Sequence, residues 1–287
     1  MASPATKRTQ QLPGWLHDLL ERHLELQVEL PVLPDVATRV LALCEDEKSD
    51  ARALEAVLER DPSLAAHVLR VANSAAYAPK EPIVSLQQAV SRLGLPSIRT
   101  IALGISLQGR VFQMPGHQSR VRSIWMHCAV AAVYARETAR KLRRNVEGAF
   151  LCGLLHDIGR PVVLQATVDA LAHRTKDPLP VPLLETAMDE FHAGVGARMV
   201  ESWKLADWTV SAIEHHHHPE RAAGHEDVAR VVYLADRLSH WALDEESSAA
   251  DFALDDAEFE GLGLYPEDVE ALLGHRGAAL EFAEALQ

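Results

Sequence analysis

Residues 148–160 read GAFLCGLLHDIGR, an apolar segment that ends in a histidine and an aspartate. The apolar run predicts a helix, after which Gly159 supplies a left-handed stop and Pro161 starts the next element. A polar pair at the end of such an apolar helix needs a partner. Adjacent residues of a helix point about 100° apart, so His156 and Asp157 can flank one ion while the second carboxylate oxygen bridges to another.

Further histidines and one aspartate stand among apolar residues on other predicted helices. They occur in IWMHCAV (124–130), DEFHAGVG (189–196), AIEHHHHPE (212–220) and VVYLADRLSH (231–240). A single buried histidine is more often a hydrogen-bonded core residue than a ligand, and the run 215–218 is also compatible with a solvated helix end.

The joint occurrence of these residues favours a site that can bind metal, because helices of one bundle can bring them together. Imidazole and carboxylate ligands suit Fe, Mn, Zn or Co, whereas the lack of thiolates argues against a structural zinc site. The candidate metal ligands are His127, His156, Asp157, His192, His216, His217 and Asp236.

The composition restricts the classes of function. The chain has 287 residues, is 48% hydrophobic and carries a net charge of -13. It can therefore bury a sizeable core, and it offers no broad phosphate-binding face for nucleic acid. The one basic run, residues 140–144, reads as a helix end where cations meet the negative end of the macrodipole.

Nothing in the sequence indicates secretion or membrane insertion. Three cysteines, Cys44, Cys128 and Cys152, form no CxxC pair, which fits a reducing compartment. The N-terminus lacks the apolar core of a signal peptide, and no stretch approaches the ~20 apolar residues of a membrane span. We therefore expect a cytoplasmic protein.

Helix signals recur along the whole chain and predict an all-α fold. In RDPSLAAHVLRVAN (60–73), Asp61 is placed to cap a helix that Pro62 opens, and in SLQQAVSRLG (85–94), Ser85 and Gly94 mark a start and a stop. The Pro and Gly of FQMPGHQSR interrupt the pattern near residue 115. We predict a leading amphipathic helix (1–27), two packed helical lobes (28–114 and 115–245), and an acidic linker with a helical tail (246–287).

The ligand order resembles the HD superfamily of metal-dependent phosphohydrolases, and the preceding sequence narrows the resemblance to the HDOD family. The shared features are LPVLPDVATRVLAL (30–43), residues 58–79, IVSLQQAVSRLGLPSIRTIAL (83–103) and residues 195–220. The resemblance covers roughly residues 28 to 240. It implies two helical lobes, the second an HD-type bundle, and a role in bacterial signal transduction, often as a regulatory module without demonstrated catalysis.

The sequence differs from typical HDOD members in its metal ligands and from the HD-GYP group in other site residues. Many HDOD members have lost the HD ligands, whereas the seven candidates here match the ligand pattern of catalytic relatives such as the HD-GYP group. However, Ser123 stands where some HD-GYP sites have a glutamate, Arg160 stands in place of a lysine, and PERAAGHED (219–227) contains no GYP motif. Cyclic-di-GMP hydrolysis of the HD-GYP type is therefore not expected.

Two functions follow from this resemblance. The first, which we favour, is a regulatory module in which one or two divalent transition metal ions stabilise the helices or sense a ligand. Its partner would be a signalling protein or a small phosphorylated or nucleotide ligand.

The second function is a phosphohydrolase with two ions that share Asp157. His127, His156 and Asp236 would complete one ion site, and His192, His216 and His217 the other. Asp157 and Arg160 are the catalytic candidates of this hypothesis, with Arg198 as an alternative cation.

Overall fold

The structure is a computed structural model. It describes residues 11–287 except 27, 46–50, 59, 78, 112–113, 115, 173, 175–178, 256–257 and 259–260. Every regular element in these residues is a helix, which confirms the predicted all-α class. None of the helices in these ranges is long and apolar enough to cross a lipid bilayer.

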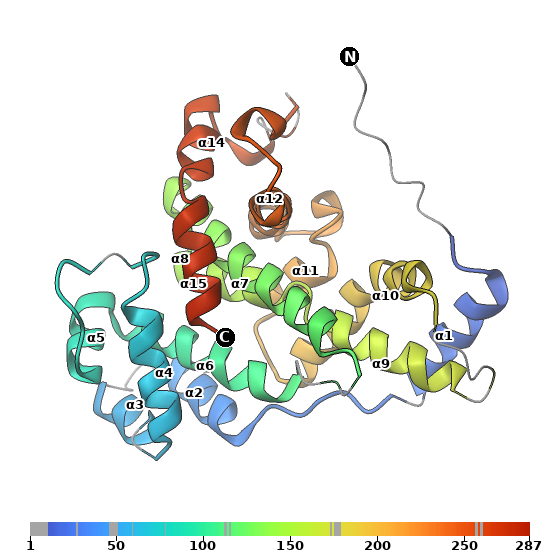
Figure 1. The fold of residues 1–287 in the computed structure, drawn as a ribbon, viewed down its shortest axis with the longest axis horizontal. Helices are drawn as coiled ribbons and strands as arrows, with labels where there is room; N and C mark the ends of the chain where they lie inside the picture. The colour runs from blue at the N-terminus through green and yellow to red at the C-terminus, as the bar shows by residue number, and fades with distance from the viewer. Residues whose placement is uncertain are drawn as a thin grey trace.

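The helices between residues 35 and 111 pack together at the lower left of Figure 1. The predicted signals explain where they begin and end. Asp61 accepts a hydrogen bond from the Leu64 amide (3.0 Å), Ser85 accepts one from the Gln88 amide (3.2 Å), and Gly94 has a φ of +82° that favours glycine. The elements are α2 (Asp35–Glu45), α3 (Ala51–Leu58), α4 (Pro62–Ala72), α5 (Leu86–Leu93) and α6 (Leu95–Val111).

A second group of helices surrounds α7, which runs through the centre of the molecule (Figure 1). Almost the whole second half of α7 is buried, because α8, α12 and α15 all pack on it. Pairs α9–α10 and α10–α11 also make extensive contacts. The helices are α7 (Gln118–Lys141), α8 (Val146–Leu155), α9 (Gly159–Leu171), α10 (Val181–Ser202), α11 (Asp207–Glu214) and α12 (Glu226–Leu243).

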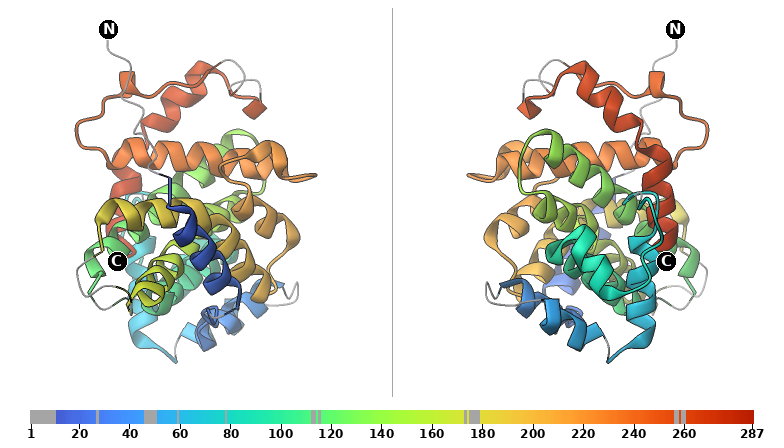
Figure 2. Two further views of the ribbon diagram at one scale, coloured as in Figure 1. Left: turned by 90° about the vertical axis from the view of Figure 1, so that its right-hand side faces the viewer. Right: turned by 90° about the vertical axis from the view of Figure 1, so that its left-hand side faces the viewer.

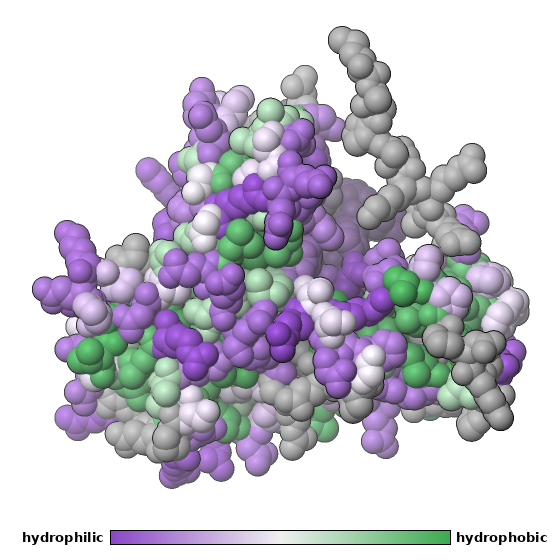
Figure 3. All heavy atoms as spheres, in the orientation of Figure 1, coloured by the Kyte–Doolittle hydropathy of each residue, from purple (hydrophilic) through white to green (hydrophobic). Residues whose placement is uncertain are grey.

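The two ends of the chain fold back onto these helices. Helix α1 (Gly14–Leu26) lies against α9, far from α2 (Figures 1 and 2). A short 3-10 turn at Pro219–Arg221 connects α11 to α12, and a second at Ala249–Asp251 follows α12. The tail then forms α14 (Pro266–Leu273) and α15 (Arg276–Ala285), and α15 contacts both α7 and α4. One continuous group of buried apolar residues runs from α1 to α15. On the face in Figure 3, hydrophilic side chains surround smaller hydrophobic groups.

The predicted boundary near residue 115 falls between α6 and α7, partly in residues outside the described ranges. Within the apolar segment 148–160, the residues up to Leu155 lie in α8, a turn follows, and α9 begins at Gly159, two residues before the start that the sequence indicated at Pro161.

The prediction that Gly159 is a left-handed stop was wrong. Gly159 is the first residue of α9 and is not among the glycines with positive φ. A glycine is required there because α9 begins against the backbone of α10. A Cβ at Gly159 would overlap the carbonyl oxygen of His192 and lie 2.7 Å from the amide nitrogen of Gly196.

Replacing Gly159 with alanine should therefore separate α9 from α10. We expect Gly159→Ala to lower the free energy of unfolding by about 3 kcal/mol, because a backbone clash in a packed core is relieved only by moving helices. Chemical denaturation followed by circular dichroism measures this change.

Gly194→Ala in α10 is the matched control, because a Cβ there has no neighbour within 4 Å. It should leave stability unchanged or raise it by up to about 1 kcal/mol, as alanine favours helix over glycine. Equal effects of the two substitutions would contradict the close-approach explanation.

Candidate metal centre

Five separate segments bring the seven predicted ligands to one place. His127 lies on α7, His192 on α10 and Asp236 on α12. His156 and Asp157 occupy the turn between α8 and α9. His216 and His217 follow the end of α11 at Glu214, so the helix predicted through the histidine run stops before them. The seven residues form two adjacent clusters.

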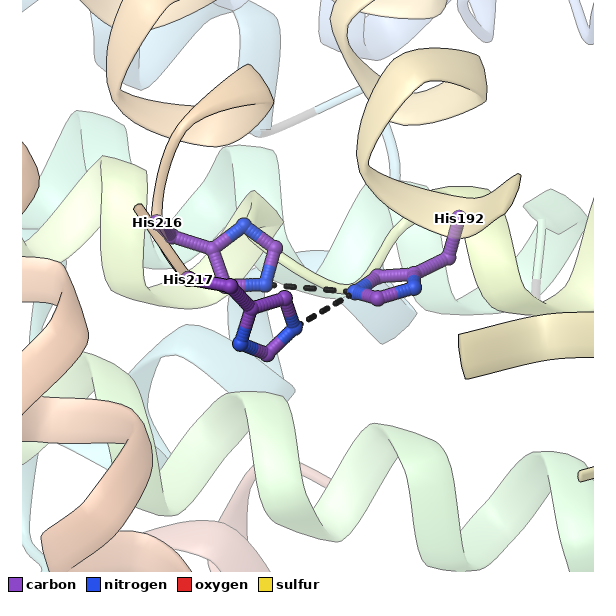
Figure 4. Close-up of side chains that lie close together, drawn as sticks. All are labelled: His192, His216 and His217. Atoms are coloured by element: carbon purple, nitrogen blue, oxygen red, sulfur yellow. Dashed lines mark hydrogen bonds between the residues drawn. The ribbon is translucent and has the colours of Figure 1, made fainter. Parts of the chain in front are cut away.

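The first cluster contains His192, His216 and His217 (Figure 4). Their Nε2 atoms face one another, at 3.2 Å between His192 and His216 and 3.1 Å between His192 and His217. The Nδ1 atoms of His192 and His216 donate to the carbonyl oxygens of Met188 (2.7 Å) and Ile213 (2.6 Å). Since a carbonyl only accepts, each neutral ring has its single proton on Nδ1 and a bare Nε2.

Burial keeps these rings neutral. It lowers the pKa of His192 to about 4 and holds that of His216 well below its ordinary value. Two unprotonated Nε2 atoms therefore face each other at 3.2 Å with no proton between them. Two lone pairs at this distance repel each other, and a cation between them removes the repulsion.

The second cluster contains His127, His156, Asp157 and Asp236. Nε2 of His127 lies 3.1 Å from Nε2 of His156 and 2.9 Å from Oδ1 of Asp236. His156 donates from Nδ1 to the Gly153 carbonyl at 2.7 Å. Burial would lower the pKa of His156, but the nearby carboxylates Asp157 and Asp236 raise it overall.

Asp157 lies between the two clusters and directs one oxygen to each. Its Oδ1 is 3.2 Å from Nε2 of His192, and its Oδ2 is 3.7 Å from Nε2 of both His127 and His156. Burial would raise the pKa of Asp157, but Arg160 and the histidines hold it well below its ordinary value.

The Oδ1 atom of Asp157 tests whether this donor set fits a metal ion. It is buried and has no hydrogen-bond partner within the described residues. A buried carboxylate oxygen without a partner is costly, and divalent cations bind such an oxygen well. Together with the bare imidazole nitrogens, it gives the donor set expected of a metal site whose histidines are oriented by backbone carbonyls.

A cavity of about 1030 Å³ opens over both clusters. His127, Asp157 and His217 form part of its wall, and α10 contributes Glu185 and Asp189. The side chain of His217 is 41% exposed, so the cluster can be reached from solvent.

Two arginines at this cavity are paired with acids. Arg160 donates to Asp157 (2.6 Å) and to Asp189 (2.8 Å), and Arg120 pairs with Glu185. The alternative cation Arg198 lies elsewhere, because its guanidinium donates to the Leu24 carbonyl of α1. Arg160 is thus the predicted cation that reaches the clusters.

Sequence reasoning missed two residues of α12 that support the second cluster. Ser239 lies with its Oγ 2.9 Å from Nδ1 of His127, and His240 lies with its Nε2 3.5 Å from Oδ1 of Asp236. The signal was present, because Asp236, Ser239 and His240 are spaced by three and four residues and so share one helix face.

Comparison with known proteins places the chain in a family. A model of the HDOD domain matches residues 30–219, about two thirds of the chain. The protein belongs to the HDOD family. The matched residues of this HDOD protein include six of the seven candidate ligands, and Asp236 follows them on α12.

Relatives and solved structures resemble this HDOD protein over most of its length. An uncharacterized protein of Treponema pallidum (strain Nichols) is 24% identical over 196 residues, which cover 66% of this chain but only 38% of that relative. A candidate phosphohydrolase from Shewanella amazonensis SB2B is 25% identical, with a TM-score of 0.70 over 95% of this chain and all of that chain.

A candidate metal-dependent phosphohydrolase from the same organism is 20% identical, with a TM-score of 0.72 over 96% of this chain and 98% of that one. At this identity the likeness shows the shared helical fold.

The buried histidines give the metal-free HDOD protein a defined pH dependence. The pKa of His192 is about 4 in the folded protein and 6.5 as its ordinary value. Between these pH values the unfolded chain binds more protons, so lowering the pH from 6.5 to 4 decreases the free energy of unfolding. The decrease caused by His192 is absent above pH 6.5, is complete below pH 4, and amounts to ~3 kcal/mol.

Urea denaturation of EDTA-treated protein at several pH values measures this dependence. We expect His192→Gln to flatten the slope between pH 4 and 6.5, while groups common to both proteins cancel in the comparison. An unchanged slope in the variant would show that His192 is not held neutral by burial.

Proposed function

We propose that this protein is a bacterial signal-transduction module of the HDOD type that binds divalent transition metal ions and presents them to a small phosphorylated ligand. The observation that carries the proposal is the set of bare acceptors around Asp157: its unpartnered Oδ1 and the facing Nε2 atoms of His192 and His216. His192, His216 and His217 would hold one ion. His127, His156 and Asp236 would hold a second, and Asp157 would serve both.

The donor set suits first-row divalent ions. Imidazole nitrogens and carboxylate oxygens bind Fe, Mn, Zn or Co, and the facing nitrogens of the histidine cluster lie 3.1 to 3.2 Å apart, close enough to bind one ion together.

Metal binding would act on the fold as a whole, because the ligands come from α7, α10, α12 and the turns after α8 and α11. An ion that binds only when these segments are assembled stabilises that arrangement by mass action. A phosphorylated ligand in the cavity would contact the ions and Arg160, and its binding would be transmitted to helices that a partner protein can recognise.

Elemental analysis tests the metal proposal directly. Untagged protein equilibrated with Mn²⁺ or Fe²⁺ and then desalted should contain one to two ions per chain. The His156→Ala, Asp157→Ala double variant should lose them, because it removes two ligands including the shared carboxylate.

His218→Ala is the matched control for this experiment. His218 belongs to the same histidine run, but its side chain is 58% exposed and pairs with Glu220. We expect full metal content in this variant, whereas His216→Ala should lose metal. Wild-type protein without stoichiometric metal would refute the proposed function.

A second function, metal-dependent phosphohydrolysis, is favoured by one observation: both clusters open onto the same solvent-connected cavity beside Arg160. The name given to the Shewanella structure at 25% identity points the same way. Bound ions would supply Lewis-acid activation of water and of the phosphate oxygens. The chain would contribute Asp157 to position both sites and Arg160, fixed by Asp157 and Asp189, to neutralise charge on the phosphate.

Turnover assays on metal-loaded protein separate the two functions. If the protein is a hydrolase, a panel of nucleotides and phosphodiesters should include a substrate, Asp157→Ala should abolish its hydrolysis, and Arg160→Ala should slow it by about 10²-fold. Arg160→Lys should lose less, because it keeps the charge. If the protein contains stoichiometric metal but hydrolyses no compound of the panel, the hydrolase function is excluded and the regulatory function remains.

A further inference from the structure

A second cavity, of about 430 Å³, lies at the opposite ends of the helices that carry the metal ligands. Its floor is apolar and comes from α7, α8 and α12, with Ala139, Ala149 and Val231. Trp208 of α11 forms an aromatic wall, and Arg144 and Asn145 lie at the rim. This combination of an apolar floor and a few polar groups is typical of small-molecule sites.

The indole of Trp208 is held in a fixed position against α8. A Cβ at Gly148 would lie only 2.8 Å from Cη2 of the ring and 2.6 Å from Nδ2 of Asn145, so the ring packs where a side chain would otherwise be. In the described part of the chain, neither the indole N–H of Trp208 nor the imidazole of His225 forms a hydrogen bond. The wall therefore offers a flat aromatic surface and free polar groups to a ligand.

The rim of this cavity is suited to an anion. Helices α8 and α12 both begin here, after Asn145 and His225, so the positive ends of two helix dipoles meet at the rim. The first turn of α12 carries Glu226 and Asp227, and the carboxylate of Asp227 accepts a hydrogen bond from the Val228 amide (2.8 Å). Arg144 contributes a guanidinium that is 57% exposed and bonded to Asp227 at 2.8 Å. Because an exposed ion pair is worth little, an incoming anion can compete for this guanidinium, whose other N–H groups remain available.

We propose that this cavity is a second binding site for a small aromatic anion of the size of a nucleoside monophosphate. The ring stacks on Trp208 above the apolar floor, and the anionic group binds Arg144 at the start of α12. Base stacking on an aromatic side chain accepts any base, so the site selects ring and charge more than base identity.

The position of the site links it to the metal centre. Helix α8 spans ~15 Å from Asn145 to the turn with His156 and Asp157. Helix α11 carries Trp208 near its start and is followed by His216 and His217, and α12 runs from the rim to Asp236. A ligand that fixes these helix starts therefore changes the affinity of the metal ligands at their other ends. This coupling rests on the proposed function, whereas the binding site itself does not.

Isothermal titration calorimetry with AMP and GMP tests the binding site. The titrations use EDTA-treated Asp157→Ala protein, so that a phosphate cannot bind to metal. We expect saturable binding that is weakened about tenfold by Arg144→Ala, which removes the cation, and by Gly148→Ala, which displaces the ring of Trp208.

Arg143→Asn is the matched control. It removes the neighbouring charge outside the cavity, and asparagine tolerates the φ of 54° at this position. Binding in this variant should equal that of the parent, as should its circular dichroism. If AMP and GMP do not bind, or if the Arg143→Asn, Arg144→Ala and Gly148→Ala variants bind them with equal affinity, the proposed binding site is wrong.

Titration of wild-type protein with Mn²⁺, with and without saturating AMP, tests the coupling. We expect Mn²⁺ affinity to change by at least fivefold, and AMP affinity to change by the same factor when Mn²⁺ is bound. An Mn²⁺ affinity that AMP does not change would contradict the coupling, but it would not contradict the binding site for AMP. Failure to bind Mn²⁺ at all would instead refute the proposed function.

Discussion

Three backbone carbonyls determine the chemistry of this protein. The oxygens of Gly153, Met188 and Ile213 each accept the Nδ1 proton of a buried histidine and thereby orient its Nε2 toward the centre of the bundle. Each carbonyl precedes its histidine by three or four residues, so the helical backbone fixes the ring. The aspartate between the clusters, with its buried and unpartnered Oδ1, completes a donor set of the kind that divalent cations bind.

The packing of the helices maintains this arrangement. Helix α10 carries His192, and the turn before α9 carries His156 and Asp157, so the backbone contact at Gly159 sets the distance between the two clusters. Helix α7 forms the centre of the lobe, and α12 attaches to it with Asp236 and Ser239 beside His127. The candidate metal centre is therefore a product of long-range packing and not of one motif.

Much of this organisation could be predicted from the sequence. Local signals such as the caps Asp61 and Ser85 located helices. The ordered set of histidines and aspartates identified residues that the fold brings together, because residue type and order can be read without knowing distances. The role of Gly159 could not be predicted, since the carbonyl it approaches is 33 residues away in sequence. The positions of Arg198 and of His240 likewise depend on which helix lies opposite, and the sequence of one helix does not contain that information.

Helices α12 and α15 lie outside the residues matched by the HDOD domain, yet they complete the core and the candidate site. The HDOD match ends at residue 219, yet α12 supplies Asp236 after it, and α15 buries Phe282 against Phe150 and Tyr77. A fragment trimmed to the matched residues would keep six ligands but would expose the apolar side of α7. The folded unit is thus longer than the matched segment, because the core around α7 is completed by helices that lie outside it.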